Sequence, residues 1–239
     1  MKVVMPIAGR GSRFTNVGIK IPKPLIPVLG KPMVQRAVES IPFVPLKDYI
    51  FIAQKDHQKK FGLGDKLKEL FGKDVKIIYI NKVTEGAACT VLLAEDLINT
   101  NEDLLLMDTD HYFKATLEKA IEEKEMEVSG IIPVHLSNDP KWSFTKINRK
   151  GYVVEVAEKK PISKFANVGS YYFSKGKDFV WGAKQMIKKN IRVNNEFYVA
   201  PVYNQLINDG HKIKILLADE MWEMGTPSDL EYFVKNFRV

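Results

Sequence analysis

The sequence predicts a three-layer α/β fold built around a mixed, mostly parallel central sheet. In the first half of the chain, short apolar and β-branched segments alternate with helical patterns, as in strands joined by right-handed helical crossovers. After Val128 the predicted strands follow one another closely, with few helical patterns between them. This change favours a mixed sheet or an added β-subdomain in a β-rich second half.

The chain opens with residues 2–8, an apolar stretch typical of a buried parallel strand. A loop rich in proline and glycine follows to Gly30, and Pro32 suits the first turn of a helix. The remaining elements of this half alternate strictly. The expected strands are 2–8, 48–53, 75–80 and 104–107, and the expected helices are 32–41, 57–71, 87–98 and 114–125.

The second half is expected to add strands first and helices later. We expect strands at 128–135, 142–147, 152–156, 167–173 and 212–217, and helices at 176–190, at 195–208 and after Pro227. The chain contains no internal repeat or low-complexity stretch, and no flexible linker separates the two halves. We therefore expect one domain over residues 1–239, with 1–125 and 126–239 as its two halves.

Composition narrows the class of protein. A chain of 239 residues is long enough to bury a large core without disulfides or a structural metal. The single cysteine, Cys89, forbids an internal disulfide, which is compatible with a reducing compartment. Residues 1–30 lack the apolar run of a signal peptide, and no later stretch approaches a membrane span. We expect a cytoplasmic protein with no membrane partner.

The formal net charge of +7 raises the question of nucleic-acid binding. The basic residues are dispersed in pairs such as Lys59-Lys60, Lys159-Lys160 and Lys188-Lys189, and no basic–aromatic stripe accompanies them. A mildly basic balance also suits an enzyme that handles small, phosphate-rich substrates. We expect no nucleic-acid partner.

A phosphate-binding loop is predicted where the first strand ends. In open α/β sheets ligands bind at such strand ends, and the glycines of residues 9–13 allow backbone N–H groups to approach a phosphate. Arg13 adds a guanidinium, and Lys23 is presented between Pro22 and Pro24. Phe14 replaces the third glycine of a dinucleotide fingerprint, and no Gly-Lys-Ser/Thr follows, so NAD and P-loop sites are disfavoured.

Two carboxylates follow the fourth predicted strand. Asp108 and Asp110 come directly after the apolar residues 104–107, at the sheet edge where the phosphate loop is expected. Carboxylate oxygens are ligands that Mg²⁺ prefers. The sequence therefore predicts Mg²⁺ as the cofactor.

Two segments in this order and spacing resemble a known family. Residues 5–14, Met-Pro-Ile-Ala-Gly-Arg-Gly-Ser-Arg-Phe, and 22–28, Pro-Lys-Pro-Leu-Ile-Pro-Val, are similar to the signature of sugar-phosphate nucleotidyltransferases. Glucose-1-phosphate thymidylyltransferase and the related uridylyl-, cytidylyl- and guanylyltransferases carry it, as do enzymes of capsule biosynthesis. The likeness covers nearly the whole chain and implies the Rossmann-like, GT-A-like fold of nucleotide-diphospho-sugar transferases.

The resemblance also implies roles by position. Residues 1–125 would bind an NTP and residues 126–239 a small phosphorylated acceptor. Thr109 and Glu223 depart from the family, which often has a small residue before the metal carboxylate and commonly an Asp at the second metal position. The implied catalytic residues are Arg13 and Lys23; the nucleotide-binding residues are Ala8, Gly9, Gly11, Ser12, Arg13, Glu85, Gly86 and Ala87; the metal ligands are Asp110 and Glu223; and the acceptor-binding residues are Glu158, Lys159, Asn167, Gly169, Glu196 and Tyr198.

The implied activity is transfer of a nucleoside monophosphate to a sugar phosphate or another small phosphate monoester, with release of pyrophosphate. Two alternatives stay open. The first is a GT-A glycosyltransferase, which would use Asp108-Thr109-Asp110 as its Asp-x-Asp motif. The second is a non-catalytic sensor on the same fold, which the glutamate at 223 keeps open. The base, the acceptor and the oligomeric state, homo-oligomer included, cannot be read from the sequence.

Overall fold

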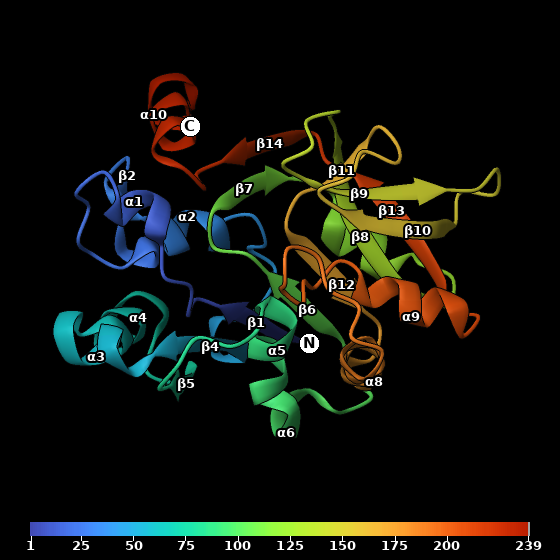
Figure 1. Cartoon of the computed structure of the whole chain (residues 1–239), viewed down its shortest axis with the longest axis horizontal. Helices are drawn as coiled ribbons and strands as arrows, with labels where there is room; N and C mark the ends of the chain where they lie inside the picture. The colour runs from blue at the N-terminus through green and yellow to red at the C-terminus, as the bar shows by residue number, and fades with distance from the viewer. Residues whose placement is uncertain (239) are drawn as a thin grey trace.

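The computed structural model describes residues 1–238 (Figure 1). Its first half contains the four expected strands, joined by short helices and a proline-rich loop. The strands and helices of this half are β1 (Lys2–Pro6), α1 (Ser12–Thr15), η1 (Lys23–Leu25), β2 (Pro27–Val28), β3 (Lys31–Pro32), α2 (Met33–Val38), η2 (Leu46–Asp48), β4 (Tyr49–Gln54), α3 (Lys55–Phe61), α4 (Leu63–Phe71), β5 (Lys76–Ile80), α5 (Ala87–Val91), η3 (Leu92–Ala94), α6 (Glu95–Ile98), β6 (Leu104–Met107), β7 (His111–Lys114) and α7 (Leu117–Glu122).

The second half contributes the remaining strands and the longest helix. Its elements are β8 (Val128–Leu136), β9 (Ser143–Ile147), β10 (Val153–Glu158), β11 (Phe165–Asn167), β12 (Ser170–Phe173), α8 (Gly176–Lys188), α9 (Val202–Asn208), β13 (Lys212–Leu217), β14 (Glu220–Glu223) and α10 (Pro227–Asn236). Among residues 1–238, no helix is both long enough and apolar enough to span a bilayer.

One ten-stranded sheet runs through both halves in the order β10-β9-β11-β8-β12-β6-β1-β4-β5, with β13 paired to β8. Pairing is parallel along β6-β1-β4-β5 and between β13 and β8, and antiparallel at the other neighbours. Followed from strand to strand, these pairings give β10, β11 and β12 one direction and the other seven strands the opposite one. The predicted α/β fold with a mixed, mostly parallel sheet is confirmed.

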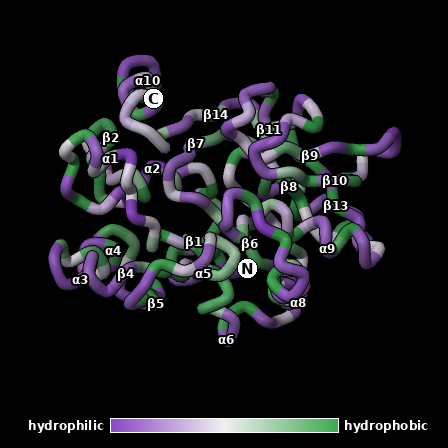
Figure 2. Tube along the Cα trace, viewed as in Figure 1, coloured by the Kyte–Doolittle hydropathy of each residue, from purple (hydrophilic) through white to green (hydrophobic). Residues whose placement is uncertain are grey.

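The sheet is covered on both faces, which makes three layers. In β1 the side chain of Val4 packs into the cluster beneath α5, α8 and α9, whereas Val3 and Met5 pack into the cluster beneath α2 and α4. A strand buried on both faces reads as a continuous apolar run, as residues 2–8 do. The central strands are accordingly largely hydrophobic, and polar residues gather on the outer helices and loops (Figure 2).

Several predicted elements are divided in the structure. The helix expected at 57–71 breaks at Gly62, whose φ of 62° ends α3 and starts α4. The helix expected at 87–98 is three short helical segments, α5, η3 and α6. The strand expected at 167–173 divides around Gly169, whose φ of +76° turns the chain between β11 and β12. Helical spacing and apolar runs do not reveal such breaks.

Two expected helices start later than predicted, and four strands were missed, of which β2 and β3 pair with each other across Leu29 and Gly30. The helix expected at 195–208 begins at Val202, because Asn194 and Asn195 have positive φ and form a tight turn in which Val193 and Glu196 exchange backbone hydrogen bonds. The charged helix expected at 114–125 begins at Leu117, because His111–Lys114 is a strand. That strand, β7, pairs with β14, which was not predicted either.

Helix α8 allows a test of the packing beneath the sheet. Phe179 is fully buried and packs edge-on against Phe173 of β12, with ring centroids 5.4 Å apart. We expect Phe179→Ala to lower the free energy of unfolding by about 3–5 kcal/mol, because it leaves a cavity in a close-packed core. Denaturant titration measures this. Lys188→Ala, at an exposed position of the same helix, should change it by less than about 0.5 kcal/mol, and equal effects would contradict the assignment.

Candidate active site

The loop after β1 forms one wall of a cavity of about 440 Å³. Gly11 adopts a φ of 62° and leads into α1, and a Cβ added to it would lie 3.4 Å from the Cβ of Lys23. The glycine therefore lets the lysine segment pack closely against the loop. We call this cavity the first chamber; its lining includes Gly9, Gly11, Ser12, Arg13, Lys23, Ala87, Asp108, Asp110, His111, Glu196 and Tyr198.

Lys23 crosses the first chamber to the carboxylates. Pro22 precedes it in an extended conformation, and η1 begins at Lys23 itself. Its ammonium donates a hydrogen bond to Asp110 Oδ2 at 2.5 Å. The strand-end argument and the family resemblance together predict Arg13, Lys23 and Asp110 around one site. All three line the first chamber.

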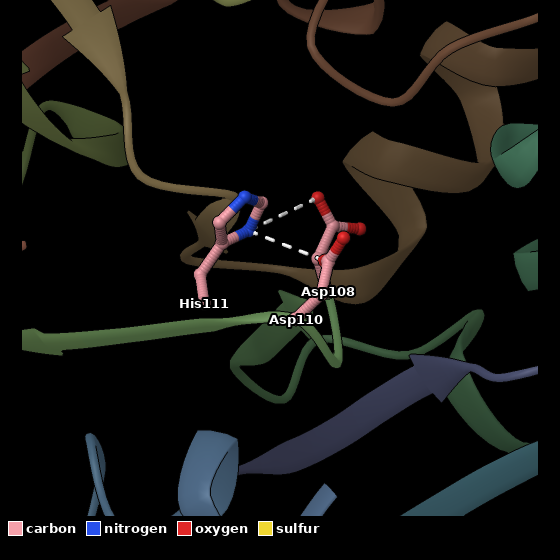
Figure 3. Close-up of side chains that lie close together, drawn as sticks. All are labelled: Asp108, Asp110 and His111. Carbon is pink, nitrogen blue, oxygen red and sulfur yellow. Dashed lines mark ion pairs between the residues drawn. The ribbon is translucent and has the colours of Figure 1, made fainter. Parts of the chain in front are cut away.

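The carboxylates lie in the turn between β6 and β7. Asp108, Asp110 and His111 point toward one another (Figure 3). The Nδ1 atom of His111 lies 3.5 Å from Asp110 Oδ1 and 3.9 Å from Asp108 Oδ2. Each of the three residues offers one potential ligand atom, and these atoms lie within 4.8 Å of one another. Asp108 thus belongs to the same cluster as Asp110.

The two aspartates differ in protonation. Burial, followed by the negative charge of Asp110, raises the pKa of Asp108 to about 7. Burial also opposes ionisation of Asp110, but Lys23 and His111 outweigh it and hold the pKa of Asp110 well below its usual value. Asp110 is therefore the permanently charged member of the pair near neutral pH.

Glu223 reaches the same place through β14. In the pairing of β14 with β7, Glu223 lies opposite His111, and the next residue, Met224, donates its backbone N–H to the carbonyl of Asp110 at 2.7 Å. A Cβ on Gly225 would lie 2.9 Å from Asp110 Oδ2 and 3.3 Å from Glu223 Oε1. The glycine therefore leaves open the space between the two carboxylates.

The residues present fit a divalent cation. The carboxylates of Asp108 and Asp110 converge with the His111 imidazole, and the buried Nδ1 atom of His111 has no hydrogen-bond partner. The Glu223 carboxylate lies across the Cβ position of Gly225 from Asp110. Oxygen-rich sites of this kind suit Mg²⁺. The Glu223 carboxylate is at present engaged by the ammonium of Lys141, which also lies 3.5 Å from Asp229. The assignment of Asp110 and Glu223 as metal ligands stays a prediction.

A second chamber of about 150 Å³ adjoins the first and shares the residues Arg13, Ala87, Asp108, Asp110, His111 and Tyr198 with it. Glu158, Asn167 and Gly169, three of the predicted acceptor residues, line it together with Tyr198. Asn167 accepts a hydrogen bond from the Thr145 hydroxyl, and its buried amide nitrogen has no partner. Glu158 accepts one from Ser143, and burial raises the pKa of its carboxyl group.

The other two predicted acceptor residues lie elsewhere. Lys159 does not line either chamber; its ammonium donates to the Tyr198 hydroxyl at 2.8 Å and lies 4.9 Å from the centre of that ring. Glu196 lines the first chamber and not the second. The structure therefore brings four of the six predicted acceptor residues to the second chamber.

The residues predicted to surround the nucleobase lie at the start of α5. Gly86 packs against the backbone of Phe197, where an added Cβ would lie 2.4 Å from its carbonyl oxygen. Ala87 lines both chambers, and Glu85 pairs with Arg192 at 2.5 Å. Ala8 is buried, and its carbonyl accepts a hydrogen bond from Gln54. A third cavity of about 560 Å³ is lined by Gly9, Arg10, Gly11, Ser12, Val83, Thr84, Glu85, Arg192, Asn194, Asn195 and Glu196.

Sequence reasoning missed several residues of the second chamber. Lys141, Trp142, Ser143 and Tyr171 all line it. Trp142 is 9% exposed and packs edge-on against His135 and at a tilt against His111. The sequence offered one signal for them, their position: residues 141–143 lie at the start of one predicted strand, and Asn167 begins another. Only the pairing of β11 with both β8 and β9 shows that they face the same space.

Comparisons with known proteins identify relatives of the chain. A family model described as nucleotidyl transferase matches residues 2–236. The bifunctional protein GlmU of Methanocaldococcus jannaschii is 26% identical over 235 residues, which cover 96% of this chain and 52% of that protein. The low-salt glycan biosynthesis nucleotidyltransferase Agl11 of Haloferax volcanii is 25% identical over 96% of this chain and 64% of that protein. The chain thus spans about half to two thirds of these relatives.

Solved structures share the fold. The nucleoside-diphosphate-sugar pyrophosphorylase of Vibrio cholerae RC9 superposes with a TM-score of 0.81 at 23% identity, over 98% of this chain and 100% of that one. The inositol-1-phosphate CTP transferase of T. maritima superposes with a TM-score of 0.74 at 18% identity, over 100% of this chain and 97% of that one. At these identities the similarity concerns the fold alone.

The candidate metal cluster can be tested by binding. Asp110→Asn removes the charged carboxylate of the cluster, so we expect the affinity for Mn²⁺, used as a probe for Mg²⁺, to fall by about tenfold or more, the loss of one charged ligand interaction. Calorimetric titration measures the affinity. Asp74→Asn, an exposed aspartate outside the cluster, should leave it unchanged. Indistinguishable Mn²⁺ titrations for Asp110→Asn and the unaltered chain would rule the site out.

Proposed function

The chain belongs to the nucleotidyl transferase family, and on this premise we propose that it transfers a nucleoside monophosphate from an NTP to a small phosphate monoester and releases pyrophosphate. The acceptor class is a sugar 1-phosphate or another small phosphate monoester. The single observation that carries the proposal is the first chamber, where Arg13, Lys23 and Asp110 surround a loop of backbone amides. These are the groups that a polyphosphate and a divalent cation need.

The reaction joins two anions. The acceptor phosphate carries about −1.5 to −2 charges near neutral pH, and its oxygen attacks the α-phosphorus of the NTP in line. The new bond joins the acceptor oxygen to that phosphorus, the bond to the β-phosphate oxygen breaks, and the electron pair leaves with pyrophosphate. A bound Mg²⁺ supplies neutralisation of phosphate charge. The chain contributes fixed positive groups that need no rearrangement during the reaction.

The position of each protein group in the site suggests its role in the reaction. Loop residues 9–13 present backbone N–H groups to the phosphates, and Arg13, at the junction of the two chambers, stabilises charge on the leaving group. Lys23 lies against Asp110, where the α-phosphate and the acceptor phosphate would meet. The second chamber holds the acceptor. Glu158, Ser143 and Asn167 offer it a carboxylate, a hydroxyl and an amide, a mixture that suits hydroxyl groups.

A role in making surface glycans extends the proposal. It is supported by the resemblance of residues 5–14 and 22–28 to enzymes of capsule biosynthesis and by the similarity to the glycan biosynthesis nucleotidyltransferase of Haloferax volcanii. In such a role the product would be an activated nucleotide-linked group for a later transferase.

The competing GT-A glycosyltransferase activity would use Asp108-Thr109-Asp110 to hold a nucleotide-sugar. The proximity of Asp108 to Asp110 is compatible with it. A glycosyltransferase expels no pyrophosphate, however, and has no need of Lys23 against Asp110. Pyrophosphate release from four NTPs, each with glucose 1-phosphate, N-acetylglucosamine 1-phosphate, inositol 1-phosphate and glycerol phosphate, separates the two activities. Absence of pyrophosphate throughout would contradict the proposal.

Lys23 should contribute strongly to kcat. Lys23→Ala removes a fixed charge beside the reacting phosphates, so kcat should fall by about 10²–10³, or about 2.7–4 kcal/mol. The measurement is pyrophosphate release at saturating substrates. Lys20→Ala removes the same charge from an exposed position of the same loop and should leave kcat within about twofold. A near-normal kcat for Lys23→Ala, with its thermal stability retained, would refute the role.

A further inference from the structure

The charges of the second chamber pose a problem for an anionic acceptor. Its lining includes four carboxylates, those of Asp108, Asp110, Glu158 and Glu223. Lys23 pairs with Asp110 from the neighbouring chamber and Lys141 pairs with Glu223, so Asp108 and Glu158 have no lysine or arginine partner within the described residues 1–238. These carboxylates would repel the phosphate of an entering acceptor, so the phosphate needs a positively charged partner of its own.

Two side chains of fixed positive charge line this chamber within the described part of the chain, Arg13 and Lys141. Arg13 also lines the first chamber, where it faces the nucleotide phosphates. Lys141 lines the second chamber alone. Lys159, which the family resemblance assigns to the acceptor phosphate, lines neither chamber, and its ammonium donates to the hydroxyl of Tyr198, which lines both.

We propose that Lys141 is the cation that receives the phosphate of the acceptor, and that it neutralises Glu223 until the acceptor enters. This inference rests on the proposed function and names a specificity-determining residue for it. Lys141 lies in the loop between β8 and β9, next to Trp142, and its ammonium lies 5.0 Å from the centre of the Trp142 ring. The ring attracts the ammonium, which keeps Lys141 near the chamber wall while its ion-pair partners can change.

The present contacts of Lys141 are easily exchanged. Its side chain is 42% exposed, and its ammonium is shared among Glu223, Asp229 at 3.5 Å and Asp139 at 4.0 Å. Ion pairs of partly exposed lysines contribute little, and a lysine stem has many rotamers. A phosphate dianion at the chamber wall is the stronger partner. The exchange also releases the Glu223 carboxylate toward Asp110, where the candidate metal ligands lie.

Binding of inorganic phosphate tests the inference without turnover. In calorimetric titrations with the first chamber filled by a non-hydrolysable NTP analogue, Lys141→Met should raise the Kd for phosphate by about tenfold, the loss of one charge-assisted hydrogen bond. Lys141→Arg keeps the charge and should restore most of the affinity. Lys164→Met is the matched control, because Lys164 is exposed and its ammonium likewise lies over a neighbouring ring, that of Phe165 at 5.5 Å.

Steady-state kinetics give the second measurement. Lys141→Met should raise KM for the acceptor by about tenfold and leave KM for the NTP within about twofold. An unchanged phosphate Kd in Lys141→Met overturns the inference, as does a loss of affinity that appears in Lys159→Met instead. If phosphate binding depends on Lys141 but no acceptor yields pyrophosphate, the inference about Lys141 stands and the proposed activity falls.

Discussion

The ion pair between Lys23 and Asp110 joins the two parts of the site that the rest of the structure brings together. Lys23 belongs to the proline-rich loop that packs on the phosphate loop, and Asp110 belongs to the turn after β6. A lysine that is held against a half-buried carboxylate keeps its position before any substrate arrives. Such preorganised charge is effective in a site that must bring two anions together.

The small β7–β14 sheet supports this pair from outside the main sheet. It places Glu223 opposite His111 and joins Met224 to the carbonyl of Asp110 by a backbone hydrogen bond. The chain returns to the first half at this point only after crossing the whole second half, as Figure 1 shows. The geometry of the carboxylates therefore depends on the C-terminal segment as well as on the turn that carries Asp110.

Under the proposed function the second half selects the acceptor, and two of its polar side chains lack full hydrogen bonding or are costly to ionise. The buried amide nitrogen of Asn167 lacks a partner, and the carboxyl group of Glu158 has a raised pKa because it is buried. Such groups are costly unless a ligand satisfies them. If this chamber holds the acceptor, these groups favour acceptors that satisfy them, with Lys141 in the chamber wall as the proposed partner of the phosphate.

The sequence by itself determined the α/β class, the first strand and the glycine-containing loop at its end, because parallel strands deliver their carboxyl ends to one edge of a sheet. The meeting of Arg13, Lys23 and Asp110 was predicted from this rule together with the family resemblance. Only the tertiary structure decided the position of Lys141 and the displacement of Lys159 toward Tyr198. Those positions depend on left-handed turns and on long-range strand pairing. Neither leaves a periodic pattern in the sequence, since a turn is set by single φ angles and a pairing by residues far apart in the chain.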